Sequence, residues 1–135
     1  MKKKLLFICT HNSARSQMAE GLVNHFWKDR CQAFSAGTQP GIVNPFAIKV
    51  MKEQGIDISN ARSKNASKFI GKAFDLVVTV CDSAKEICPF FPGAKEYIHK
   101  GFPDPSQAKG DENEIIAAFR KMRDDIYIWL KNILD

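Results

Sequence analysis

Short apolar runs alternate along this chain with longer segments in which apolar residues recur at helical spacing. The first run, residues 3–8, is followed by a helical pattern that starts near Arg15 and ends near Phe26. A second short run, 33–36, precedes another helical pattern, which Asn44 caps. This alternation is typical of a parallel sheet whose strands are joined by crossover helices. We therefore predict an α/β fold, with an open parallel sheet of about four strands and helices on both faces.

The same alternation continues into the second half of the chain. Residues 75–80 form a β-branched run that predicts a strand buried on both faces, and residues 95–99 predict a last strand at the edge of the sheet. Between residues 112 and 134, apolar side chains follow one side of a helical pattern, which predicts a long helix packed on the core. The 135 residues are enough for one such domain, 1–135.

The turn between the first strand and the first helix carries the most informative motif. A strand-to-helix turn of small and polar residues directs several backbone N–H groups at one point, where an oxyanion can bind. The same field favours the thiolate form of a cysteine placed there, which is the nucleophilic form. The alternative is a structural cysteine that ends a core strand, followed by an ordinary helix start. The motif consists of Cys9, Thr10, His11, Asn12, Ser13, Ala14, Arg15 and Ser16.

Two further cysteines follow the buried strand. Cys81 stands at its carboxyl end and Cys88 lies seven positions later, directly before Pro89. Sites in open α/β sheets form beyond the carboxyl ends of strands, so Cys81 and Cys9 are expected to face one pocket. A helix would hold the Cα atoms of Cys81 and Cys88 about 10 Å apart, whereas a disulfide tolerates less than about 7 Å. A bond between them therefore requires the segment to bend; otherwise Cys88 is an unrelated loop cysteine.

A carboxyl group with a restricted backbone follows the edge strand. Asp104 stands between Pro103 and Pro105, which limit its conformations. Beside an anion-binding cysteine, such a carboxyl group suits a general acid that protonates a leaving oxygen. The alternative is an ordinary turn aspartate. His99 or Lys100 could supply the proton in principle.

Composition narrows the classes of function. The net charge of +5 is modest and the lysines are scattered, so a small anionic substrate accounts for the charge as well as a nucleic acid does. The apolar run after the first lysines is too short for a signal peptide, and no segment approaches the length of a membrane span. We expect a cytoplasmic protein without nucleic-acid or membrane partners. Its cysteines are expected to be reduced, chemically active thiols that bind no metal, except that Cys31, which has no helper group beside it, is expected to serve in packing.

Together these motifs resemble the low-molecular-weight phosphotyrosine phosphatase superfamily, and within it the thioredoxin-coupled arsenate reductases. The loop at Cys9 marks the superfamily, and the pair Cys81 and Cys88 marks the reductase branch. The resemblance covers essentially the whole chain. The matching stretches are 9–21, Ser35-Ala36-Gly37, Val43-Asn44-Pro45, Asp57-Ile58-Ser59, 81–89, 101–105 and Arg123-Asp124-Asp125-Ile126.

The resemblance implies a three-cysteine relay for arsenic detoxification. Cys9 would attack arsenate held by Arg15 and the loop amides, and Asp104 would protonate the departing hydroxide. Cys81 would then attack the sulfur of the Cys9 adduct, release arsenite and leave a Cys9–Cys81 disulfide. Cys88 would move the disulfide to Cys81–Cys88, where thioredoxin reduces it. The resemblance also implies a monomer with no obligatory cofactor, and phosphate or sulfate as analogues of arsenate.

Two loop residues depart from the family pattern, and one matches a family role. His11 stands where better-known reductases have glycine, so a left-handed backbone there would be strained. Ala14 replaces a cysteine common before the arginine, which leaves Cys81 as the resolving thiol. Ser16 is placed to hydrogen-bond the Cys9 thiolate.

Some relatives bind potassium beside this loop. Asn12, Glu20 and Ser35 match that site, but Lys64 stands where an acidic ligand is expected. Because a lysine ammonium can take the place of the ion, we do not expect potassium dependence.

Two other functions compete with arsenate reduction. A phosphotyrosine phosphatase is the nearest, since phosphate and arsenate share shape and charge. Phosphatases of this fold usually carry aromatic residues after the Asp-Pro pair, whereas Ser106 follows here, and they have no use for a resolving cysteine pair. We therefore expect arsenate reduction with weak phosphatase side activity. A non-catalytic protein that binds arsenite or senses oxidants through its cysteines would not need Asp104.

Overall fold

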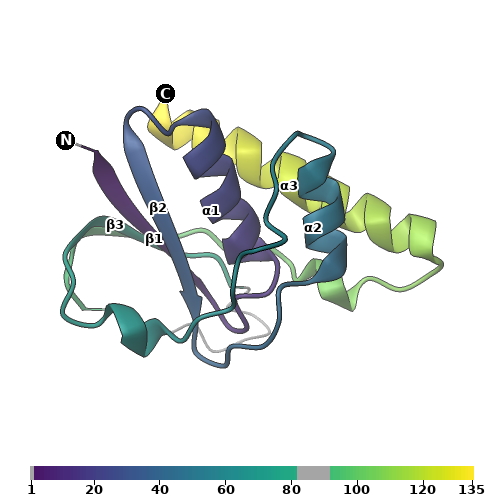
Figure 1. Ribbon diagram of the computed structural model, residues 1–135, viewed down its shortest axis with the longest axis horizontal. Coiled ribbons are helices and arrows are strands. Elements are labelled where there is room, and N and C mark those ends of the chain that lie inside the picture. The colour runs from purple at the N-terminus through teal and green to yellow at the C-terminus, as the bar shows by residue number, and fades with distance from the viewer. Residues whose placement is uncertain (1, 82–91) are drawn as a thin grey trace.

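The computed structural model describes residues 2–81 and 92–135. Within them, four parallel strands form one sheet in the order β2-β1-β3-β4, which confirms the predicted open parallel sheet (Figure 1). The strands are β1 (Lys3–Cys9), β2 (Cys31–Gly37), β3 (Phe74–Thr79) and β4 (Ala94–His99). The helices are α1 (Arg15–Phe26), α2 (Pro45–Lys52), α3 (Glu112–Leu134) and the short 3₁₀ helices η1 (Ala66–Phe69) and η2 (Pro105–Gln107).

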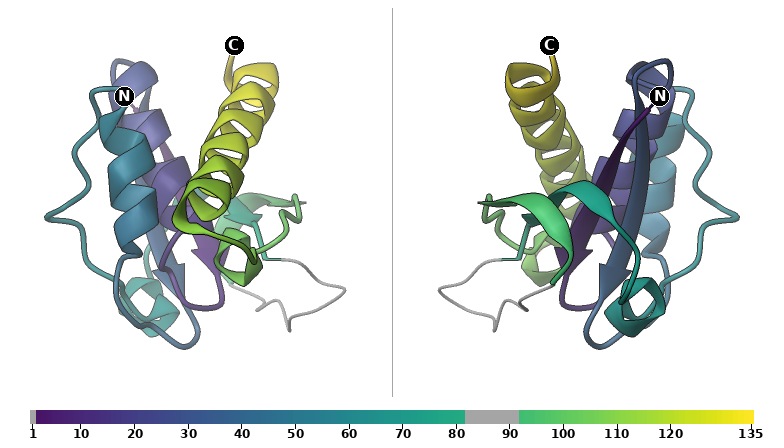
Figure 2. Two further views of the ribbon diagram at one scale, coloured as in Figure 1. Left: turned by 90° about the vertical axis from the view of Figure 1, so that its right-hand side faces the viewer. Right: turned by 90° about the vertical axis from the view of Figure 1, so that its left-hand side faces the viewer.

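The two faces of the sheet are covered differently. Side chains alternate along β1, so Leu5 and Phe7 pack with the three α-helices, while Leu6 and Ile8 point to the opposite face. Figure 2 shows α1, α2 and α3 together on one side of the strands.

The second face of the sheet is covered by an aromatic cluster that includes a short helix. Phe69 of η1 packs against Phe34 and Phe74, with ring centroids 5.8 and 5.9 Å away. Among the described residues, the helix on this face is η1, a 3₁₀ helix of four residues. None of the described helices is both long and apolar enough to cross a membrane.

The helices differ in how their first turns are capped. Asn44 caps α2 by accepting a hydrogen bond from Phe46 N, and Pro45 occupies the first turn, as predicted. Asp111 and Glu114 form a reciprocal capping box at the start of α3. By contrast, α1 follows Ala14, and no side chain caps it. The N-cap residue of α1 therefore offers no side-chain acceptor at the site described next.

Buried charge fixes α3 to the end of α2. Arg123 is 5% exposed, and its Nη1 donates to Val50 O (2.7 Å) and to Glu53 Oε1 (2.9 Å). Arg120 donates to both oxygens of Glu53, and these hydrogen bonds are the main reason why the pKa of Glu53 falls to about 2. The family stretch that begins at Arg123 is thus a structural anchor between two helices.

Candidate active site

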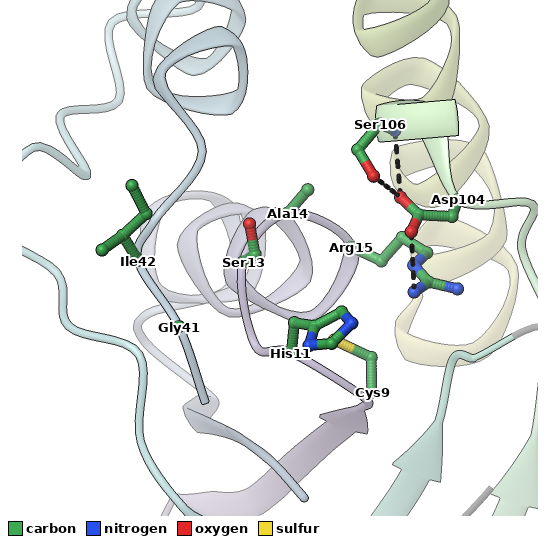
Figure 3. Close-up of a pocket in the computed structure, with 9 residues that line it drawn as sticks. All are labelled: Cys9, His11, Ser13, Ala14, Arg15, Gly41, Ile42, Asp104 and Ser106. Atoms are coloured by element: carbon green, nitrogen blue, oxygen red, sulfur yellow. Dashed lines mark hydrogen bonds and ion pairs between the residues drawn. The ribbon is translucent and has the colours of Figure 1, made fainter. Parts of the chain in front are cut away.

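A cavity of about 230 Å³ opens at the carboxyl end of β1 (Figure 3). It brings Asp104 together with Cys9 and Arg15 of the loop, the three residues that the sequence placed in one site although Asp104 lies far along the chain from the other two. The wall is completed by His11, Ser13, Ala14, Gly41, Ile42 and Ser106. Sequence reasoning did not assign Gly41 and Ile42 to the site, because nothing local marks the segment after β2 as part of it.

The carbonyl groups of the loop are held by donors from outside it. Because the N–H of a trans peptide points away from the C=O of the same peptide, the N–H groups of residues 11–14 are left for the other side. None of these four N–H groups donates to an acceptor within the described residues. The carbonyl bonds are Gln39 N to Thr10 O (2.8 Å), Gly41 N and Ser63 Oγ to His11 O (3.3 and 2.7 Å), Gln17 Nε2 to Asn12 O (3.2 Å), and Asn44 N to Ser13 O (2.9 Å).

The end of β2 approaches this loop so closely that only glycine fits. A Cβ on Gly37 would lie 2.6 Å from Thr10 O and 2.8 Å from Asn12 N. Backbone atoms cannot move aside without displacing the loop, so the absence of a side chain at Gly37 shapes the anion cradle. This explains the Ser35-Ala36-Gly37 stretch in the resemblance.

The left-handed residue of the loop is Asn12, with φ of 50°, so the expectation of left-handed strain at His11 is wrong. Asn12 is fully buried, and its side chain compensates for the strained backbone. Its Oδ1 accepts hydrogen bonds from Gln17 Nε2 (3.0 Å) and Lys64 N (2.9 Å). Its Nδ2 donates to Ser16 Oγ (2.8 Å).

This network reaches the sulfur of Cys9. Ser16 Oγ lies 2.9 Å from Cys9 Sγ and already accepts a hydrogen bond from Asn12 Nδ2. The hydroxyl hydrogen of Ser16 is therefore available to Cys9, and a thiolate is the better acceptor for it. The predicted contact between Ser16 and Cys9 is confirmed.

Arg15 and Asp104 form the opposite wall. The Arg15 side chain is 3% exposed; its Nη1 donates to Phe102 O (3.2 Å), and its Nη2 lies 3.7 Å from Asp104 Oδ2. Asp104 caps η2, and its Oδ1 accepts hydrogen bonds from the backbone N and Oγ of Ser106 (2.9 and 2.7 Å). Ser106 therefore fixes one carboxylate oxygen and leaves Oδ2 on the side of Arg15, as Figure 3 shows.

Cys81 lies at the same edge of the sheet as Cys9. β1 and β3 are neighbours with Ile8 opposite Thr79, and Val80 N continues the pairing by donating to Ile8 O (2.9 Å). Cys81 is fully buried and disulfide-bonded, whereas Cys9 and Cys31 are free. The expectation of reduced thiols thus holds for Cys9 and Cys31 but not for Cys81. Cys88 and Pro89 lie outside the described residues, and their roles stay predictions.

The residues that match a potassium site lie together, but they do not fit the ion. Ser35 Oγ donates to Glu20 Oε1 (3.0 Å), and Asn12 Oδ1 is already occupied by two N–H donors. The Lys64 ammonium donates to Arg62 O (2.6 Å) and interacts electrostatically with Glu20. Burial raises the pKa of Glu20 and lowers that of Lys64, and the attraction between the two charges opposes both shifts. A second cation beside Lys64 would be repelled.

A buried cysteine beside a loop whose N–H groups at residues 11–14 have no acceptor in the described part of the chain, at the end of a parallel strand, is the arrangement expected in proteins that bind tetrahedral oxyanions. The model of the low molecular weight phosphotyrosine protein phosphatase family matches residues 4–134. The chain belongs to this family.

Several relatives that match almost the whole chain are named arsenate reductases. The chain is 46% identical over 125 residues to an arsenate reductase of Halalkalibacterium halodurans. This match covers 93% of this chain and 90% of that protein. The structure of an arsenate reductase in a phosphate-binding state is similar, with a TM-score of 0.78, 28% identity, and 97% and 95% of the two chains covered. A thioredoxin-dependent arsenate reductase of Corynebacterium glutamicum gives a TM-score of 0.69 at 29% identity, with 98% of this chain and 62% of that chain covered.

Proposed function

We propose that this protein reduces arsenate to arsenite, with Cys9 as the nucleophile. The observation that carries the proposal is the meeting of Cys9, Arg15 and Asp104 in one cavity, with Cys81 at the end of the adjacent strand. Similarity to arsenate reductases over almost the full chain supports the same reaction.

The first half of the reaction builds an arsenic–sulfur bond. Arsenate would bind to the N–H groups of residues 11–14 and to Arg15, which together offset its negative charge. Cys9 Sγ attacks arsenic and displaces a hydroxyl group, and protonated Asp104 donates its proton to that group so that it leaves as water. Arsenic remains pentavalent in this adduct.

The second half transfers two electrons. Cys81 is disulfide-bonded in the structure, so this half begins after a dithiol has reduced that bond. The Cys81 thiolate attacks Cys9 Sγ, the electron pair of the sulfur–arsenic bond moves to arsenic, and arsenite leaves. Cys88 then attacks Cys81, which restores the Cys9 thiolate and forms a Cys81–Cys88 disulfide. An external dithiol reduces this disulfide. We propose thioredoxin for this step, because a similar structure is named as thioredoxin-dependent.

Phosphate-ester hydrolysis is the second candidate activity, expected to be weak. It needs only Cys9, Arg15 and Asp104, which are all present. Ser106, which bonds Asp104, takes the position after the Asp-Pro pair where a phosphatase would grip an aromatic ring. We further propose that the protein is a cytoplasmic monomer. It is also proposed to work without potassium, because the Lys64 ammonium supplies the positive charge beside Glu20.

Arsenate-dependent oxidation of NADPH tests the reaction and the partner together. The assay contains thioredoxin and thioredoxin reductase in one arm, and glutathione with glutaredoxin in the other. We expect turnover with thioredoxin, none with Cys9→Ser, and near-normal turnover with Cys31→Ser as the matched control. No turnover in either arm would overturn arsenate reduction, and turnover confined to the glutaredoxin arm would overturn only the thioredoxin assignment.

A further inference from the structure

The imidazole ring of His11 lines the cavity that contains Cys9 (Figure 3). The ring is exposed, and its Nδ1 lies 3.0 Å from the backbone oxygen of Gln39. A carbonyl oxygen can only accept a hydrogen bond, so Nδ1 must carry the hydrogen. This contact fixes both the orientation of the ring and its tautomer.

The fixed tautomer leaves Nε2 as the nitrogen that changes its protonation state. Nε2 bonds to none of the residues in the described ranges 2–81 and 92–135. In the neutral ring it is an acceptor, and in the imidazolium it becomes a second donor. Histidine is the side chain whose ordinary titration range lies nearest to neutral pH.

The ring lies among charged groups of both signs, so the negative charge of a bound anion is what favours a proton on it. The cavity contains two groups that can be negative, Cys9 and Asp104, and the Arg15 guanidinium. The segment 38–44, which packs on the loop, contributes no charged side chain. The segment around Ser63, whose Oγ donates to His11 O, carries Arg62 and Lys64. A bound oxyanion adds negative charge to this balance.

We infer that His11 Nε2 is a proton-linked ligand of the oxyanion. The imidazolium donates a hydrogen bond to an anionic oxygen; equivalently, the neutral ring accepts one from a protonated oxygen. Either description gives a complex that holds one proton more than the neutral enzyme and the dianion do separately. The inference deepens the proposed function, since the oxyanion in question is arsenate or its phosphate analogue.

Calorimetry of phosphate binding in the full-length Cys9→Ser protein measures this proton without turnover. At about pH 8, titrations in two buffers of different ionisation enthalpy give the number of protons taken up. The serine removes the thiol as an alternative proton acceptor. We expect uptake of about one proton in Cys9→Ser.

Two substitutions at His11 separate the roles of its two nitrogens. His11→Asn keeps an N–H donor for Gln39 O but has no group at the Nε2 position. We expect it to lose the proton uptake and to weaken phosphate binding by about tenfold, the usual size of a charge-assisted hydrogen bond. His11→Gln places a non-titrating amide near the Nε2 position, so it is expected to bind phosphate without proton uptake.

Unchanged proton uptake and affinity in both His11 variants would overturn the inference, and so would uptake that disappears only with Asp104→Asn. Thermal unfolding of each variant confirms that it is folded. An enzyme that shows the His11-dependent proton but does not reduce arsenate would support this inference and overturn the proposed function.

Discussion

Cys9 and Cys31 are both buried free thiols on neighbouring strands, yet they lie in opposite chemical environments. β1 and β2 run parallel, with Lys3 opposite Cys31 and Cys9 opposite Gly37. Cys9 therefore lies at the carboxyl end of its strand and Cys31 at the amino end of the neighbouring strand. Cys9 meets a hydroxyl group and an amide-lined cavity. Cys31 packs in the hydrophobic core, where burial raises the pKa of its thiol despite the nearby Arg30 and Lys3. The strand end, rather than burial, distinguishes a reactive thiol from a structural one.

Substitution of the two cysteines has the largest expected effect. Cys9→Ser removes the attacking sulfur and should lower arsenate reduction by about 10⁴-fold or more. Cys31→Ser leaves the cavity intact and should stay within about twofold of the parent enzyme at a temperature where both are folded. Steady-state rates of the pre-reduced proteins measure both. Equal losses of arsenate reduction in the two variants would contradict the distinction between a reactive Cys9 and a structural Cys31.

Substitution of Cys81 or Cys88 should separate arsenate reduction from phosphate-ester hydrolysis. Cys88→Ser should permit about one turnover and trap a Cys9–Cys81 disulfide, because no thiol remains to release Cys9. Cys81→Ser should abolish arsenate reduction but retain hydrolysis of a phosphate ester. Single-turnover arsenite release and peptide mass analysis measure the first, and an aryl phosphate assay measures the second. Sustained turnover of Cys88→Ser with thioredoxin would contradict the relay.

Ser16→Ala tests how far the hydroxyl group activates Cys9. Hydrogen bonds to charged groups contribute about 1.5–3 kcal/mol, so alkylation of Cys9 near neutral pH should slow by about 10- to 100-fold. Ser35→Ala is a matched control, because Ser35 is equally buried but bonds Glu20 instead of the sulfur. Rates of iodoacetamide labelling, resolved by peptide, make the comparison. A loss of the same size in both variants would assign the effect to packing.

The smallest expected effect concerns the pH dependence of stability at Cys31. Its pKa is raised in the folded protein, so the thiol stabilises the fold below the ordinary thiol pKa of about 8.5. This contribution is lost as the pH rises through the higher folded value, because the unfolded chain then releases its proton more readily. Urea unfolding of the parent and of Cys31→Ala between pH 7.5 and 10 should show a shallower alkaline decline in the variant. An identical decline would exclude Cys31 as its source.

Much of the fold and of the site could be predicted from local patterns. The strand at 3–8, the Cys9 loop and the capped start of α2 each depend on neighbours in sequence, and the structure confirms them. The proximity of Asp104 to Cys9 could be predicted because a cysteine that attacks an oxyanion needs a general acid for the leaving oxygen.

Features that depend on distant contacts could not be predicted in this way. The left-handed backbone falls on Asn12 rather than His11, because Lys64 and Gln17 hold the Asn12 side chain. Phe102 anchors Arg15 through a backbone oxygen, which no residue type reveals. The covering of the second sheet face by Phe69 depends in the same way on contacts between separate segments.

Because no side chain caps the start of α1, the unfolding temperature of this protein is expected to depend on the anions in the buffer. An oxyanion seated at Ala14 supplies the hydrogen-bond acceptor that a serine or an aspartate would otherwise provide. A ligand that binds only the native state at 100 times its dissociation constant adds about 2.7 kcal/mol to the free energy of unfolding. Inorganic phosphate is thus expected to act as a reversible helix cap, and the protein should unfold at a lower temperature in buffers that contain no tetrahedral anion.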